Sequence, residues 1–242
     1  MKKILCLTTF SLLLCACGDN SSAPQEIDFA SLCPTNARGT FIDDRDGHEY
    51  RYTTIGKQVW MAENLTYEMK YYNDDGSELT SFCNYGVYGS CYYPPFKDIY
   101  PDITLEESLC PKGWHVPSND EIDELIKNVG GYGIAGQILK SSSGWGNINP
   151  DENSNGTDAC GFDMKPGSMF FSSNDESDYK KNYYGSFMSS THVPNMSVYA
   201  EDSTGRYYHD IFYSYIFYSR SDSVQRWEEN YHSSDYIRCV KD

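Results

Sequence analysis

Hydrophobic and polar positions alternate with a period of two soon after residue 39. Residues 40–42, 50–55 and 58–61 show this alternation, and each run is rich in β-branched and aromatic side chains. Residues 43–47 separate the first two runs, and Gly47 can adopt the positive φ that a tight turn needs. The pattern predicts an antiparallel hairpin followed by a third strand.

The period changes to that of a helix after residue 117. Ser118 followed by Glu121 forms a capping-box pattern, and two glycines at 130–131 end the helix. A shorter helix is expected over residues 134–140. The apolar positions of the first helix recur at helical spacing: Ile122, Leu125, Ile126 and Val129.

The remaining segments are less regular. Residues 83–109 have no clear period and contain three prolines, which predicts a loop with one short helix near Leu105. Residues 141–182 are rich in Ser, Gly, Asn and Asp, and a segment this long predicts either a loop with a function or short strands. Residues 207–218 and 236–240 are predicted as the last strands. The order of elements indicates an α+β domain.

The N-terminus has the pattern of an export signal. Lys2 and Lys3 precede an apolar run over 4–15, which is too short to span a membrane and typical of a signal peptide. The residues before Cys17 resemble a bacterial lipobox. This implies a signal peptide over 1–16, acyl chains such as palmitate on Cys17, a polar tether over 17–36 and a membrane contact made by lipid alone. An ordinary cleaved signal with an unmodified cysteine is the alternative. Gly18, where Asp would commonly signal retention at the inner membrane, favours the outer membrane.

Charge restricts the partners of the chain. It contains 35 acidic and 19 basic residues, with a formal net charge of −16. A nucleic-acid-binding protein needs a basic surface to displace counterions from phosphates. We therefore expect no nucleic-acid partner.

Six of the nine cysteines are expected in the folded domain, because Cys6 and Cys15 leave with the signal and Cys17 carries lipid. An even number in an exported protein indicates disulfides, and none of the six has the close spacing of a zinc site. The turn-rich residues 84–90 favour a local bridge. The six are Cys33, Cys83, Cys91, Cys110, Cys160 and Cys239.

One loop has a pattern that suits calcium. Residues 151–158 place oxygen-bearing side chains at alternate positions before a glycine, as in the first half of an EF-hand loop. Phe162 stands where that loop needs Glu, and an Asx-rich turn without an ion is the alternative. No other cofactor is expected. The candidate ligands are Asp151, Asn153, Asn155 and Asp158.

Two of the four tryptophans are candidate ligand-binding residues. Trp60 and Trp114 lie in patterns typical of a core. Trp145 lies in the glycine-rich loop and Trp227 lies among charged residues, so both are expected to expose an aromatic surface that sugars can stack on. Packing within the protein is the alternative for both.

The sequence contains no strong catalytic pattern. Its five histidines lack metalloprotease spacing, and 189–192 lacks the glycines of a nucleophile elbow. Paired carboxylates are uninformative in so acidic a chain. We therefore expect a protein that is not an enzyme.

Six stretches along the chain have a recognisable combined pattern: DRDGHEY (44–50), IGKQVWMAENL (55–65), CPKGWHVPS (110–118), LKSSSGW (139–145), NGTD (155–158) with GF (161–162), and IRCVKD (237–242). In these stretches and their order, the chain resembles the Fibrobacter succinogenes major paralogous domain family of exported bacterial lipoproteins. It departs from the family pattern at Ile122, where Trp is usual, and at 187–191.

The resemblance implies a domain over 37–242 with a C-type-lectin-like fold, in which two helices pack on a twisted antiparallel sheet with a long loop region. In such folds a terminal cysteine commonly pairs with one near the first helix, which implies Cys110–Cys239. Cys83–Cys91 would then be the local bridge and Cys33–Cys160 the third. The Glu-Pro-Asn and Gln-Pro-Asp triplets of calcium-dependent sugar binding are absent.

No activity is attached firmly to this family. We expect a non-enzymatic cell-envelope lipoprotein with a surface binding or structural role toward polysaccharide or protein. One alternative is an envelope-assembly protein without a glycan ligand. The other is a glycan-active enzyme or a relative of the formylglycine-generating enzymes, which use a reactive cysteine pair with copper.

Overall fold

The computed structural model describes ten segments of the chain. For the short strands between 70 and 92 and for residues 195–210, it describes the backbone alone. The described segments are 27–67, 70–72, 78–80, 82–84, 90–92, 109–147, 153–167, 182–202, 205–229 and 235–242.

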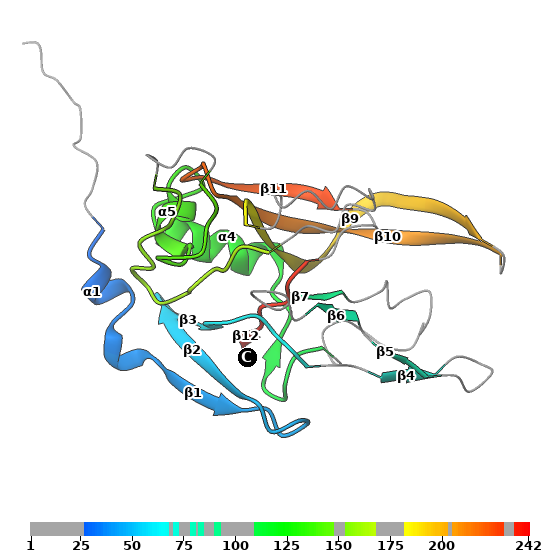
Figure 1. The fold of residues 1–242 in the computed structure, drawn as a ribbon, viewed down its shortest axis with the longest axis horizontal. Coiled ribbons are helices and arrows are strands. Elements are labelled where there is room, and N and C mark those ends of the chain that lie inside the picture. The colour runs from blue at the N-terminus through cyan, green and yellow to red at the C-terminus, as the bar shows by residue number, and fades with distance from the viewer. Residues whose placement is uncertain are drawn as a thin grey trace, which may run out of the picture.

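A five-stranded antiparallel sheet joins both ends of the described chain. Its strand order is β1-β2-β3-β12-β8, so the C-terminal strand lies between β3 and β8 (Figure 1). The predicted hairpin and third strand are confirmed. The strands are β1 (Gly39–Ile42), β2 (Glu49–Ile55), β3 (Gln58–Met61), β8 (Trp114–His115) and β12 (Val240–Lys241).

Two helices follow β8, as predicted. Helix α4 (Asn119–Asn128) begins with a complete capping box between Ser118 and Glu121, and α5 (Ala135–Leu139) follows after a short turn. The apolar stripe of α4 is buried at Ile122, Leu125 and Ile126. A short helix α1 (Phe29–Leu32) and a 3-10 turn (Thr35–Ala37) precede β1.

A second, three-stranded antiparallel sheet has the order β11-β10-β9. Its strands are β9 (Tyr184–Asp202), β10 (Gly205–Tyr218) and β11 (Val224–Glu229). Phe187, Tyr215 and Phe217 join one buried cluster with Trp60 and the apolar stripe of α4, so the main core lies between the two sheets and the helices. The far ends of β9 and β10 extend as a two-stranded ribbon beyond the rest of the described chain (Figure 1).

The described residues between β3 and β8 include two short hairpins, and the second of them extends into the segment 83–109 that was predicted as a loop. Strand β4 (Lys70–Tyr72) pairs with β5 (Glu78–Thr80), and β6 (Phe82–Asn84) pairs with β7 (Ser90–Tyr92). The loop prediction is wrong for β6 and β7, because backbone pairing across a short turn needs no long hydrophobic period. Cys83 stands opposite Cys91 in this register. Their side chains and the predicted helix near Leu105 lie outside the described part.

The C-terminal segment is less regular than the predicted strand over 236–240. Only Val240–Lys241 forms a strand. Tyr236 exchanges backbone hydrogen bonds with β9, whereas the carbonyls of Ile237 and Cys239 accept from Leu65 and Met61. Residues 236–239 therefore pass between the two sheets and bond to each in turn, which prevents a continuous ladder with either.

Two long-range disulfides close the domain, and both pairs were predicted, the first from the resemblance and the second as the pair that remained. Cys110 bonds Cys239 with 5.9 Å between their Cα atoms, and Cys33 bonds Cys160 with 5.2 Å. The first ties the segment before β8 to the C-terminus. The second ties the N-terminal segment to the long loop. The described part of the chain thus forms a mixed α/β fold of antiparallel sheets with two disulfides.

Two buried cations order the long loop region. Lys140 is 1% exposed, and its ammonium group donates to the carbonyls of Ser154, Tyr218, Ser219 and Ser221 at 3.0–3.3 Å. This contact joins the loop to the turn after β10. Arg238 is fully buried and donates to Asn64 Oδ1 and to the carbonyls of Phe162 and Asp163. Burial lowers the pKa of Lys140 and lowers that of Arg238 to about 10.

Among the described residues, no helix combines the length and apolar character that crossing a membrane requires.

Candidate functional site

Trp145 is not an exposed aromatic, and that expectation is wrong. Its side chain is 4% exposed and belongs to the main core. Its indole N–H donates to Ser141 Oγ at 3.1 Å and to the carbonyl of Met164 at 3.3 Å. The glycine-rich loop folds back over the core, so the ring fills the space beneath it and its one polar group is satisfied inside.

Trp227 is half exposed, as expected, on the edge strand β11. Its indole N–H donates to Gln225 Oε1 at 3.0 Å, which fixes the ring along the strand. Trp227 therefore remains a candidate contact residue on an open surface.

The described members of the candidate calcium loop serve backbone amides. Asn153 Oδ1 accepts from the Asn155 backbone, Asn155 Oδ1 accepts from the Trp145 backbone at 3.0 Å, and Asp158 Oδ1 accepts from the Asp163 backbone at 2.7 Å. These contacts are those of the alternative interpretation, an Asx-rich turn. Asp151 lies outside the described part. Within that part, no group of three or more His, Cys, Asp or Glu side chains could hold a metal ion.

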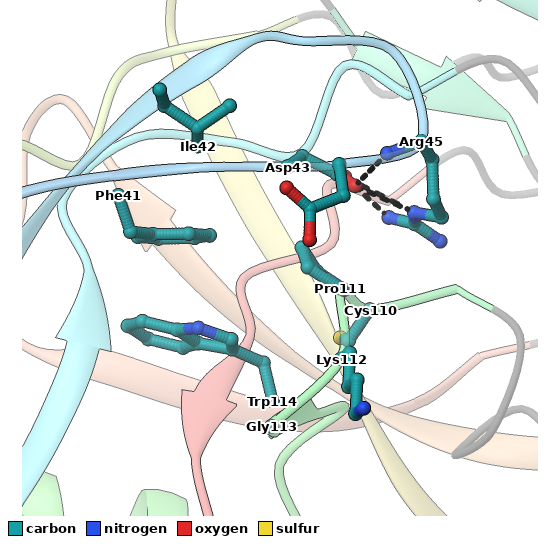
Figure 2. Close-up of a pocket in the computed structure, with 10 residues that line it drawn as sticks. Phe41, Ile42, Asp43, Arg45, Cys110, Pro111, Lys112, Gly113 and Trp114 are labelled. Atoms are coloured by element: carbon teal, nitrogen blue, oxygen red, sulfur yellow. Dashed lines mark hydrogen bonds and ion pairs between the residues drawn. The ribbon is translucent and has the colours of Figure 1, made fainter.

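A pocket of about 430 Å³ lies between the turn after β1 and the loop before β8 (Figure 2). The β1–β2 hairpin presents one wall, and the Cys110–Cys239 disulfide fixes the start of the other. The lining residues come from two segments far apart in sequence: Phe41, Ile42, Asp43, Asp44 and Arg45, with Cys110, Pro111, Lys112, Gly113 and Trp114.

One side of the pocket is a fixed ion pair. Asp43 is 1% exposed, and Arg45 donates to both of its carboxylate oxygens, with the shortest contact at 2.7 Å. A further guanidinium nitrogen donates to the carbonyl of Leu109, and the group lies 3.8 Å above the centre of the Tyr67 ring. Burial alone would raise the pKa of Asp43, but its hydrogen bonds to Arg45 and the charge of Arg45 outweigh it, so the pKa is lowered. Asp43 and Arg45 together present a neutral, immobilised pair.

The opposite side is apolar. The ring of Phe41 stacks on that of Trp114 with 4.4 Å between the centroids, and Figure 2 shows both rings across the pocket from Asp43 and Arg45. Ile42 is 62% exposed at the rim. Lys112 and Asp44, also exposed, place charges of opposite sign around the opening.

The side chains that line the pocket suit binding of a ligand through apolar contacts and hydrogen bonds. Among the ten residues that line the pocket there is no His, Ser, Thr or Tyr, and the one cysteine is held in a disulfide. A ligand in the pocket would meet the partly exposed Phe41 of the apolar wall, the partly exposed Arg45 of the ion pair, and the exposed charges of Lys112 and Asp44. Volumes of roughly 300–1,000 Å³ are typical of small-molecule sites.

Local sequence patterns do not indicate this pocket. Residues 43–47 form a turn and Trp114 is a core residue, as their patterns predict, and neither feature by itself indicates a cavity. A signal was nevertheless present, because two of the stretches that carry the family resemblance, DRDGHEY and CPKGWHVPS, supply much of the lining.

Comparison with known proteins gives a family and no nearer relative. A family model described as the Fibrobacter succinogenes major domain matches residues 53–241, which is more than half of the chain. The match begins within β2, so β1 and the turn that lines the pocket precede it. No curated protein and no solved structure matches. The chain therefore belongs to the Fibrobacter succinogenes major domain family.

Proposed function

We propose that this chain is a non-enzymatic cell-envelope lipoprotein whose pocket binds an uncharged, hydroxyl-rich ligand, such as a sugar unit of a polysaccharide. The observation that carries the proposal is the pairing of an apolar wall with a neutralised Asp43–Arg45 pair in one pocket. Sugars present apolar C–H faces and hydroxyl groups together, so they match such a pocket on both sides.

Charge favours an uncharged ligand over an anionic one. The chain carries a formal net charge of −16, which repels polyanions at long range. Arg45 is already occupied by Asp43 and Leu109, so it offers no unpaired charge to an acidic group. Lys112 and Asp44 at the rim can donate to and accept from hydroxyls.

The remaining parts of the proposal concern the fold and the cellular location of the protein. Two helices with an antiparallel sheet, a long loop region and a disulfide to the C-terminal segment support a variant of the C-type-lectin-like fold. The lipobox-like residues before Cys17 support acyl anchoring at the outer membrane. Cys17 lies outside the described residues.

Binding of the detergent-solubilised full chain to a glycan array tests the ligand class. We expect retention on one or more neutral glycans, and loss of that retention in Asp44→Lys and in Lys112→Glu, which change rim charges without touching the core. Lys57→Glu, at the exposed turn between β2 and β3, is the matched control and should bind as the wild type does. Absence of glycan binding, or equal binding by all four proteins, would overturn the proposal. Capture of an envelope protein without any glycan would instead favour the assembly alternative.

A further inference from the structure

The C-terminal residues support one wall of the pocket. Cys239 is bonded to Cys110, and Lys241 stands opposite Trp114 in the β8–β12 ladder. The backbone N–H of Asp242 donates to the carbonyl of Gly113 at 3.1 Å. Cys110, Gly113 and Trp114 all line the pocket. The position of the wall therefore depends on the last four residues being held in place.

His115 connects this tail to helix α4. Its Nδ1 lies 2.7 Å from Asp242 Oδ1, and its Nε2 lies 2.8 Å from Glu121 Oε1. The other oxygen of Glu121 accepts from the backbone and hydroxyl of Ser118, so this carboxylate is fixed at the start of α4. One imidazole ring thus bridges the first turn of a helix and the end of the chain.

This geometry requires a proton on each ring nitrogen. An ionised carboxylate only accepts hydrogen bonds, whereas a neutral imidazole has a single N–H to donate. Only the imidazolium can donate to Glu121 and Asp242 together. Deprotonation removes one of the two bonds and sets a ring lone pair against a carboxylate oxygen.

We propose that His115 is a proton-operated latch that regulates the pocket by holding the C-terminal tail against its wall. The inference rests on the proposed function, because it assigns a regulatory role to the same pocket. At low pH the charged ring holds both carboxylates and the wall is fixed. At high pH the neutral ring donates to one carboxylate only. Because Ser118 also holds Glu121 beside the ring, the bond to Asp242 is the one that is lost, and the Asp242 amide is released from Gly113.

The surroundings of His115 support this assignment. On α4 the acidic first turn contains Asp120 and Glu121, and Glu121 is the member that bonds the ring. On the C-terminal side, Val240 is the strand partner of His115, and Lys241 faces Trp114 in the register. From β3, the neutral Gln58 donates to the Glu121 carbonyl. Burial alone would lower the pKa of His115, but the bonds to Asp242 and Glu121 outweigh it and raise the pKa.

Amide exchange of the full chain, followed by NMR between pH 5.5 and 8.5, tests the latch directly. After correction for the intrinsic exchange rate, the Asp242 amide should be protected at the acidic end and should lose protection as the His115 ring nitrogens deprotonate. Protection that is independent of pH would overturn the proposal.

Two substitutions separate the latch from simple packing. His115→Gln cannot become a cation, so its Asp242 amide should exchange rapidly at both ends of the range. His115→Lys keeps a charged donor throughout, so protection should persist at pH 8.5. Loss of protection in His115→Lys at pH 8.5 alone would overturn the proton-linked role.

A binding measurement completes the test. The oligosaccharide that gives the strongest signal on the glycan array is titrated against the protein at pH 6 and at pH 8.5. Weaker binding at pH 8.5 in the wild type and equal binding in His115→Lys is the expected result. If no glycan binds while the protection of the Asp242 amide still falls as pH rises, the proposed ligand is wrong and the latch stands. If a glycan binds equally at both pH values, the latch does not regulate the pocket and the proposed function stands.

Discussion

Asn64 and Arg238 lie 174 positions apart in the sequence and meet in the buried interior, where Arg238 Nε donates to Asn64 Oδ1 at 2.9 Å. Each belongs to a stretch that carries the family resemblance, IGKQVWMAENL and IRCVKD. Their pairing connects the segment after β3 with the segment before β12. These two motif residues therefore build the interior and take no part in the pocket.

Replacing Asn64 with Ala should destabilise the protein by about 1–3 kcal/mol, because Arg238 is fully buried and would lose a hydrogen-bond acceptor. Urea unfolding with the disulfides intact measures the change. Asn36→Ala, at an exposed position in the 3-10 turn, is the control and should change the free energy of unfolding by less than about 0.5 kcal/mol. Equal effects of the two substitutions would contradict this role.

Lys140→Met should be more severe than most single substitutions, with a loss of more than about 3 kcal/mol. The methionine has similar length but no donor, so the four carbonyls that the ammonium group now serves would lose that donor together. Lys57→Met at an exposed turn provides the comparison. Thermal unfolding followed by circular dichroism measures the stability of both variants. An unchanged melting temperature in Lys140→Met would show that its hydrogen bonds to the four carbonyls do not stabilise the fold.

The stability of the fold should depend on pH through His115 and Glu121. The folded-state pKa of His115 is raised above its ordinary value of 6.5 by its two carboxylate partners, which outweigh burial. The contribution of His115 to the free energy of unfolding is therefore fully present below pH 6.5 and is lost as pH rises through the raised pKa.

The pKa of Glu121 is lowered below 4.5, because its bonds to Ser118 and His115 outweigh burial. Its contribution is present above pH 4.5 and is lost as pH falls through the lowered pKa.

The free energy of unfolding, measured in urea from pH 5.5 to 8.5, checks the first of these windows. The wild type should lose stability across this range more steeply than His115→Gln. Parallel curves for the two proteins would show that His115 does not contribute to the dependence.

The two disulfides provide a matched pair of tests. Their sequence separations are 129 residues for Cys110–Cys239 and 127 for Cys33–Cys160. The chain-entropy model predicts nearly equal losses, on the order of 4–5 kcal/mol, when either pair is replaced by Ala. A much larger loss for one pair, measured by chemical unfolding, would show that packing around that bond contributes beyond loop closure.

Cys17→Ser should prevent attachment of acyl chains and move the protein from the membrane fraction to the soluble fraction. Metabolic labelling with a fatty-acid probe, followed by fractionation, gives the measurement. Cys6→Ser, within the expected signal peptide, is the control and should leave labelling unchanged. Failure of the probe to mark the wild type would contradict the lipobox interpretation.

Local patterns predicted the elements that depend on local chemistry. The capping box of Ser118 and Glu121 and the apolar stripe of α4 follow from neighbouring residues, and both occur in the structure. The β1–β2 hairpin follows for the same reason. The positions of β6 and β7 did not follow, because three-residue strands carry too few side chains to establish a period.

Features that depend on distant contacts could not be predicted from local pattern. Trp145 lies in a glycine-rich sequence, yet Ser141 and Met164 enclose it because the loop folds back over the core. The pocket requires Asp43 to meet the segment around Cys110, and the disulfide to Cys239 places that segment. The Cys110–Cys239 pairing itself came from the family resemblance and not from spacing.

The Cys33–Cys160 bond also determines how the molecule carries mechanical load. A pull applied through the N-terminal segment reaches Cys33 before it reaches β1, and the bond passes the force across to the loop at Cys160. Part of the force therefore bypasses the hydrogen bonds between β1 and β2. Under the proposed N-terminal anchor, a drag on a bound polymer would therefore be shared between β1 and the loop around Cys160.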